Sequence, residues 1–211
     1  MPSLARCRFF LSPRKVVTMR TIHHDAKVIP ARYIPAYDEH IYEYSELSED
    51  AKSNALSNWV ESGDNISHFN SDLDEILDAV KDFTGYVGAD WVIDSWHNIS
   101  FCFNDETEYA TFSHNGFYAS MDIADEWNRH VDTMLELYNA YQDAEYGDAG
   151  EAAYRALRAE VDSALDDVRR VTQRNINDSW DYWIYEPEKA FEAECSIQGF
   201  EFDEDGDLYV A

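Results

Sequence analysis

The chain has 211 residues, of which 43 are Asp or Glu and 16 are Lys or Arg, so its formal net charge is −27. This charge opposes direct binding to nucleic acid or to an anionic membrane, because both are negatively charged. Hydrophobic residues make up 45% and aromatic residues 15% of the chain, which excludes intrinsic disorder and predicts a packed interior beneath a negative surface.

The first 18 residues differ in charge from the rest of the chain. They carry four basic residues and no acidic one, whereas 12 basic and 43 acidic residues follow from Met19 onward. We interpret residues 1–18 as a basic extension outside the fold, with a functional basic arm as the alternative. Because no low-complexity linker divides the remainder, we expect a single acidic domain over residues 19–211.

The N-terminal third predicts extended chain followed by two helices. Residues 19–44 contain Pro30 and Pro35, which favour extended chain or a short edge strand. Ser48 is a typical N-cap, and apolar residues at helical spacing predict a helix over 48–60. A second helix begins at Ser71 and has an apolar stripe on one side. An acidic stripe at positions i, i+4 and i+8 occupies the other side, formed by Asp74, Asp78 and Asp82.

The middle of the chain predicts strands. Residues 91–93, 99–103 and 109–112 have strand composition, and the second segment alternates cleanly. Asn115-Gly116 is a strong signal for a two-residue hairpin, with a returning strand from 117. We therefore expect an antiparallel meander.

Helical spacing returns over 122–146 and again after Gly150 as far as about 171, which predicts a long helical hairpin. The aromatic cluster 180–185 that follows has two interpretations, a core cluster or a binding hot spot. Pro187 begins a short helix through Cys195, and residues 197–210 predict a hairpin. The expected fold class is α+β, an antiparallel meander sheet with N-terminal helices and a C-terminal long helical hairpin.

Catalytic and metal-binding motifs are absent from the sequence. There is no P-loop, GxSxG or GxGxxG, and Asp203, Asp205 and Asp207 begin like a calcium loop that lacks the Gly of the sixth position. Cys7, Cys102 and Cys195 stand far apart, which argues against a disulfide framework or a zinc site and favours a reduced, cytoplasmic setting. We expect no enzyme, cofactor or metal.

Three segments resemble a group of small acidic proteins of phages and prophages. The segments are Tyr44–Lys52, Ile99–Phe103 and Gly199–Gly206, and the similarity in their order and spacing spans residues 40–206. The functions of this group are largely uncharacterised, so no active site can be carried over to this chain. The resemblance implies a mobile-element setting, in which acidic proteins often block host defence nucleases. In bulk character the chain is also similar to acidic antirestriction proteins and DNA-mimicking anti-CRISPR proteins, although no antirestriction motif is present.

The charge and the resemblance together predict a DNA mimic that inhibits a CRISPR effector or a restriction enzyme in the cytoplasm of a host bacterial cell. On the scale of duplex DNA, 27 charges correspond to about 46 Å of helix axis, close to the ~40–45 Å diameter of a domain of this size. The expected contact residues are Asp72, Asp74, Glu75, Asp78 and Asp82, followed by Asp162, Asp166 and Asp167.

Two other functions stay open at this point. One is an antitoxin-like or regulatory protein that binds a basic protein partner. The other is an acidic housekeeping domain of a salt-adapted host, which the 11 Arg against 5 Lys would suit and the many aromatic residues suit less well. Whether the chain forms a homodimer also stays open.

Overall fold

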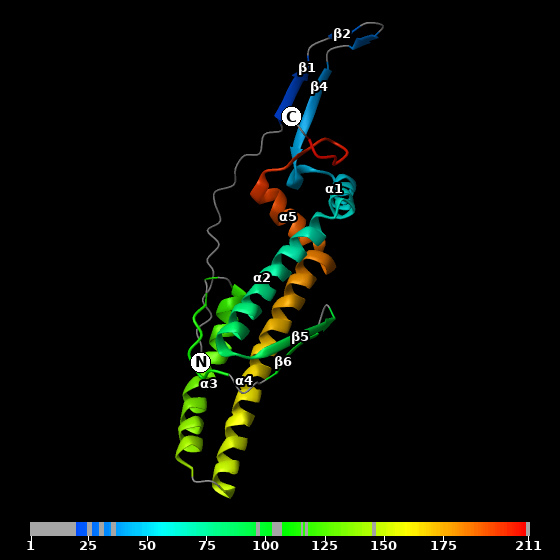
Figure 1. Ribbon diagram of the computed structural model, residues 1–211. Coiled ribbons are helices and arrows are strands. Elements are labelled where there is room, and N and C mark those ends of the chain that lie inside the picture. The colour runs from blue at the N-terminus through cyan, green and yellow to red at the C-terminus, as the bar shows by residue number, and fades with distance from the viewer. Residues whose placement is uncertain are drawn as a thin grey trace. The chain divides into compact units, whose positions relative to one another are not determined.

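The computed structural model describes residues 20–24, 27–29, 32–34, 37–95, 98–102, 107–114, 116, 118–144 and 147–209. The helices are α1 (Glu49–Ser62), α2 (Asp64–Val87), α3 (Tyr118–Asp143), α4 (Asp148–Trp180) and α5 (Pro187–Gln198), with a 3-10 turn η1 (Tyr44–Glu46) and a π-helical turn η2 (Asp181–Tyr185). The strands are β1 (Arg20–His24), β2 (Lys27–Ile29), β3 (Arg32–Ile34), β4 (Tyr37–Glu43), β5 (Asp90–Ser95), β6 (Asn98–Cys102) and β7 (Glu201–Phe202). The fold is α+β and helices dominate it (Figure 1).

The chain divides into two compact units. The first comprises Met1–Asn58 and Glu192–Ala211, and the second comprises Trp59–Phe191. The expected single domain over residues 19–211 stays a prediction, and the expected extension, residues 1–18, lies outside the described residues. None of the helices in the described part of the chain combines the length and the apolarity needed to cross a membrane.

The first unit contains a three-stranded antiparallel sheet in the order β1–β4–β7. Strands β2 and β3 pair with each other, with Ile29 opposite Arg32. The predicted extended chain over 19–44 therefore includes four strands. In the same unit, Ile41 of β4 and Phe202 of β7 are buried.

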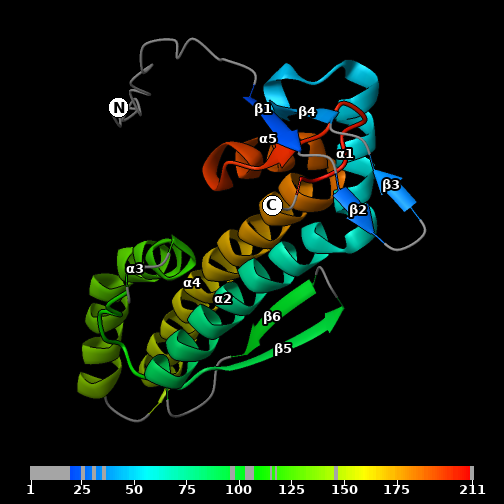
Figure 2. The ribbon, with the colours of Figure 1, turned by 90° about the horizontal axis from the view of Figure 1, so that it is seen from above.

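The second unit is built on α2, α3 and α4, which pack against one another and are labelled in Figure 2. Trp127 of α3 and Phe83 and Val80 of α2 have no exposed surface, and the Phe83 and Trp127 rings meet edge to face with centroids 5.3 Å apart. Burial of such large side chains is the main favourable contribution to folding. The apolar residues whose spacing predicted these helices lie on the buried side of each helix.

The expected meander is wrong beyond its first two strands. Strands β5 and β6 form an antiparallel hairpin, but residues 107–114 form no strand, and Tyr118 begins α3 instead of a returning strand. Side chains of α3 bind this segment: the Trp127 indole N–H donates to the Ala110 carbonyl at 2.9 Å. The Asn128 amide pairs with both the N–H and the carbonyl of Phe112, each at 2.9 Å. The backbone groups that a neighbouring strand would bind are thus bound by helix side chains.

Several helix ends also differ from the prediction, and α2 begins at Asp64 rather than at Ser71. The pattern weakens over 175–179, yet α4 continues to Trp180, because Ile176 is fully buried and the Trp180 ring packs edge-on against Phe69 at 5.1 Å. At the C-terminus, Ile197 and Gln198 belong to α5 rather than to the expected hairpin. The strand that follows is β7, and Phe202 bridges to Leu208 across an intervening turn.

Candidate partner-binding surface

The acidic stripe of α2 lies on the exposed side of the helix. Asp74, Asp78 and Asp82 are exposed, as is the neighbouring Glu75. Among the described residues, none of these four carboxylates forms an ion pair or a hydrogen bond. Lys81 is the one Lys or Arg of α2, so the surface of this helix is strongly negative. These four residues of the predicted set lie together and face solvent.

Asp72 occupies a different environment from the stripe. It is half-buried, and its Oδ2 accepts hydrogen bonds from Ser179 Oγ and from the Trp183 indole N–H, both at 2.8 Å. The carboxylate therefore links α2 to the end of α4 and to η2. Sequence reasoning grouped Asp72 with the stripe because it is acidic and adjacent. Its donors lie more than 100 positions later in the chain, so no local signal identifies this role.

The three predicted residues of α4 are also divided. Asp162 is exposed and has no ion pair within the described chain. Asp166 is exposed but pairs with Arg169 at 2.8 Å and with Arg170 at 3.4 Å. Asp167 is half-buried and contacts Arg170 as well as His130. Of these three, Asp162 presents the least compensated carboxylate.

His130 bridges two carboxylates of α4 and was not identified from the sequence. Its Nδ1 lies 2.7 Å from Glu160 Oε1, and its Nε2 lies 3.0 Å from Asp167 Oδ2. Carboxylates only accept hydrogen bonds, so imidazolium, which donates from both nitrogens, satisfies this arrangement completely. The bridge links α3 to α4.

The aromatic cluster 180–185 combines both interpretations offered by the sequence. Trp183 stacks on His68 at 4.5 Å and 15°, and Trp180 packs on Phe69, so the two tryptophans are partly buried against α2. Tyr182 is 38% exposed and Tyr185 is 77% exposed. The tyrosines of the cluster are therefore available for contact with a partner.

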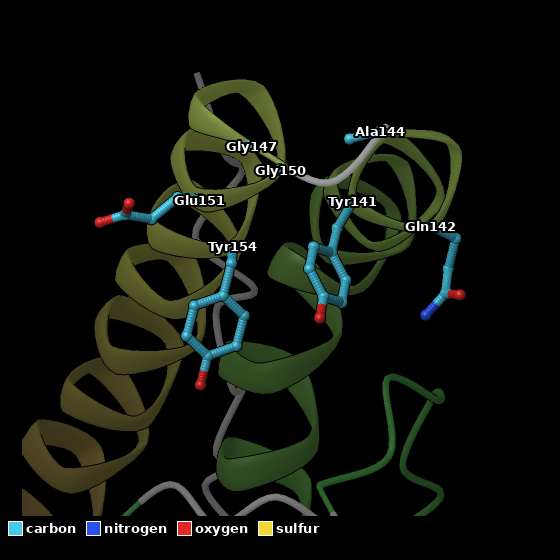
Figure 3. Close-up of a pocket in the computed structure, with 7 residues that line it drawn as sticks. All are labelled: Tyr141, Gln142, Ala144, Gly147, Gly150, Glu151 and Tyr154. Carbon is cyan, nitrogen blue, oxygen red and sulfur yellow. The ribbon is translucent and has the colours of Figure 1, made fainter.

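A cavity of about 490 Å³ lies between the end of α3 and the start of α4. Figure 3 shows the side chains of Tyr141 and Tyr154 extending side by side from the two helices, with Glu151 directed to the other side of α4. The centroids of the two tyrosine rings are 5.6 Å apart. Among the described residues of this lining, no pair of groups is arranged for proton transfer or nucleophilic attack.

A second cavity, of about 450 Å³, is lined by Cys195 together with Glu43, Glu192 and Glu201. Burial raises the pKa of the Cys195 thiol to about 12, and Glu194 adds to this shift. Since the thiolate is the nucleophilic form of cysteine, this thiol is unreactive at neutral pH. Nothing in the geometry of the cavity supports nucleophilic catalysis by Cys195.

The acidic turn near the C-terminus is held by hydrogen bonds, as the sequence predicted for a turn. Asp203 Oδ1 accepts from the backbone N–H groups of Asp205 and Asp207 at 3.0 and 2.9 Å. The amide of Asn58 donates to Asp207 Oδ1 at 2.9 Å. Within the residues that the structure describes, no group of three or more His, Cys, Asp or Glu side chains is placed to hold a metal ion.

Comparison with protein-family models, with curated proteins and with solved structures gives no match to this chain. The functional assignment therefore depends on charge, exposure and geometry. The surface with the clearest chemical character is the exposed carboxylate stripe of α2 in the second unit.

Proposed function

We propose that this chain is a phage or prophage-encoded inhibitor that mimics DNA and occupies the basic nucleic-acid channel of a host defence complex. The target class is a CRISPR effector or a restriction enzyme. The observation that carries the proposal is a set of exposed carboxylates on α2 that form no ion pair or hydrogen bond within the described part of the chain: Asp74, Glu75, Asp78 and Asp82.

The spacing of these carboxylates is close to that of phosphates. From Asp74 to Asp82 the helix rises about 12 Å, at 1.5 Å per residue. Four carboxylates over this length give one charge per roughly 3–4 Å, against one phosphate per roughly 3.4 Å along one DNA strand. A row of Lys and Arg side chains that binds a DNA strand would meet a similar charge density on α2.

The rest of the second unit reinforces this field. Residues 59–191 contain 29 Asp or Glu and 8 Lys or Arg, so the unit is strongly negative as a whole. A negative field of this kind accelerates encounter with a basic channel. Binding would release the anions associated with that channel, and we expect the affinity to fall steeply with salt.

The antitoxin-like alternative is favoured by one separate observation. Tyr118 at the start of α3 is 87% exposed, and Tyr182 and Tyr185 of η2 are 38% and 77% exposed. Exposed tyrosines are typical anchors of protein–protein interfaces and contribute nothing to mimicry of phosphates. A small basic protein that DNA cannot displace would be the partner under this alternative.

The test is capture of partners from host lysate at about 50 mM salt, followed by release with rising salt or with competing duplex DNA. The variant carries Asp74→Lys, Asp78→Lys and Asp82→Lys. The matched control carries Asp125→Lys, Asp132→Lys and Glu136→Lys, which are exposed carboxylates of α3 and change the net charge by the same amount. We expect the α2 variant to lose capture and the α3 control to keep most of it.

Recovery of a CRISPR or restriction complex that duplex DNA releases would support the proposal and identify the target. Equal loss in both variants would show that total charge matters and that the α2 stripe is not the contact. Recovery of one small basic protein that DNA cannot displace would replace the proposal with the antitoxin-like alternative. Recovery of no partner would overturn both.

A further inference from the structure

A groove of about 550 Å³ lies beside the acidic stripe, among α2, the first turn of α3 and the end of α4 with η2. All of its lining belongs to the second unit. Ile76 and Ala119 are buried at this groove, and Tyr118 and Tyr182 line it with exposed rings. The volume falls within the range of sites that hold small groups. An exposed aromatic lining of this kind is typical of a binding surface.

The groove is also negatively charged. Asp72, Glu75 and Asp178 line it, and none of the described residues that line it is a Lys or an Arg. Asp72 is held in place by its hydrogen bonds with Ser179 and Trp183, so its charge is fixed at the wall of the groove. A fixed charge beside apolar surface attracts a cation without the entropy loss of ordering a flexible side chain.

One feature of the groove, a partial positive charge, opposes the binding of a cation. The groove adjoins the N-terminus of α3 at Tyr118, where the helix dipole carries roughly half a positive charge. Three carboxylates outweigh this half charge. Arg174 is the basic residue of α4 that lies closest in sequence to the groove's lining residues. It contacts Asp122 at 3.2 Å, and this contact partly neutralises the charge of Arg174.

The rings that line the groove are suited to hold a planar cation. Tyr182 packs edge-on against Trp183 with centroids 4.9 Å apart, which restricts its motion. Tyr118 is 87% exposed and has no ring contact within the described chain, so one face is free to receive a ligand. Guanidinium stacks on aromatic rings and pairs with carboxylates through two parallel hydrogen bonds, whereas ammonium is more strongly hydrated.

We propose that this groove takes an arginine side chain of the partner protein, stacked on Tyr118 and paired with Glu75 or Asp178. The inference rests on the proposed function, because both require a basic partner protein. It adds one specific contact to the long-range electrostatic attraction of the acidic stripe. A second copy of this chain fits poorly, because it would bring the same carboxylates together. Nucleic acid is disfavoured by the same repulsion.

The test uses hexa-arginine as the probe and hexalysine as its matched peptide, at about 150 mM salt, with the full chain and isothermal titration. Tyr118→Ala removes the ring that is proposed to stack. Tyr185→Ala is the control, since Tyr185 is 77% exposed, does not line the groove and also leaves the net charge unchanged. We expect Tyr118→Ala to weaken hexa-arginine binding by about 5- to 10-fold and Tyr185→Ala to leave it within about twofold. We also expect wild type to bind hexa-arginine more tightly than hexalysine.

Equal affinities for the two variants, or for the two peptides, would overturn the proposal, because attraction would then be diffuse. Absence of binding to wild type would overturn it as well. One further variant tests whether the chain's own basic segment, residues 1–18, occupies the groove in place of a partner. It carries Arg6→Gln, Arg8→Gln, Arg14→Gln and Lys15→Gln. If wild type fails to bind and this variant binds, the groove belongs to residues 1–18 and not to a partner.

Failure of the groove and failure of the proposed function give different results. If Tyr118→Ala captures a DNA-releasable defence complex as well as wild type does, the groove proposal falls and the function stands. If hexa-arginine binding depends on Tyr118 but no DNA-releasable complex is captured, the function falls and the groove stands.

Discussion

Asp72 on α2 accepts a hydrogen bond from the indole N–H of Trp183 at 2.8 Å, across a separation of 111 residues. The same Oδ2 accepts from Ser179 Oγ. One carboxylate thus satisfies two donors at the junction of α4 and η2. A π-helical turn such as η2 is rare and often lies at a functional site, and here it positions Trp183 toward α2 and Tyr182 toward the groove.

The first prediction concerns this carboxylate. Asp72→Ala leaves the Trp183 and Ser179 donors without their acceptor, so we expect the free energy of unfolding to fall by about 1–3 kcal/mol. Asp74→Ala, two positions later and exposed, is expected to change it by less than about 0.5 kcal/mol. Urea unfolding followed by tryptophan fluorescence measures both, and equal effects would contradict the internal role of Asp72.

His130 provides a second prediction. His130→Ala removes the imidazole whose two nitrogens contact Glu160 and Asp167 of α4, and we expect a loss of about 1–3 kcal/mol in unfolding free energy. Arg129→Ala removes an exposed ion pair with Glu126 and should lose no more than about 0.5 kcal/mol. If the two variants unfold at the same urea concentration, the bridge contributes nothing to stability.

The third prediction concerns the acidic turn after β7. Gly206 has φ +88°, and a Cβ there would lie against the backbone carbonyl of Ala51. Gly199 has φ +67° but open space around it. Gly206→Ala therefore combines a steric clash with backbone strain, whereas Gly199→Ala incurs about 1–2 kcal/mol of strain alone. We expect Gly206→Ala to be the more destabilising in thermal unfolding, and the reverse order would refute the close approach to α1.

Cys195 gives a prediction that depends on pH. Burial raises the pKa of its thiol from 9.0 to about 12, so above about pH 9 the unfolded chain loses this proton while the folded chain keeps it. The unfolded state then binds fewer protons, and stability falls as pH rises from about 9 to about 12. In a Cys7→Ser background, a thiol reagent at pH 8 should label the exposed Cys102 and spare Cys195. Rapid labelling of both would contradict the burial.

The fifth prediction separates self-repulsion from salt adaptation. Screening of the negative surface should raise the free energy of unfolding between about 0.01 and 0.15 M NaCl, as the Debye length falls from about 30 to about 8 Å. We expect little further gain at 1 M. A chain that unfolds at 0.15 M and needs molar salt would instead favour the salt-adapted housekeeping interpretation.

The sequence by itself determined the charge, the apolar faces of the long helices and the acidic stripe of α2, because these depend on composition and on a period of 3.6 residues. Only the tertiary structure decided that residues 109–112 are not a strand, since Trp127 and Asn128 bind their backbone from α3. Tertiary structure also separated Asp72 from Asp74, two neighbours of identical chemistry. One faces donors more than 100 residues away and the other faces solvent, and packing between distant segments cannot be read from local spacing.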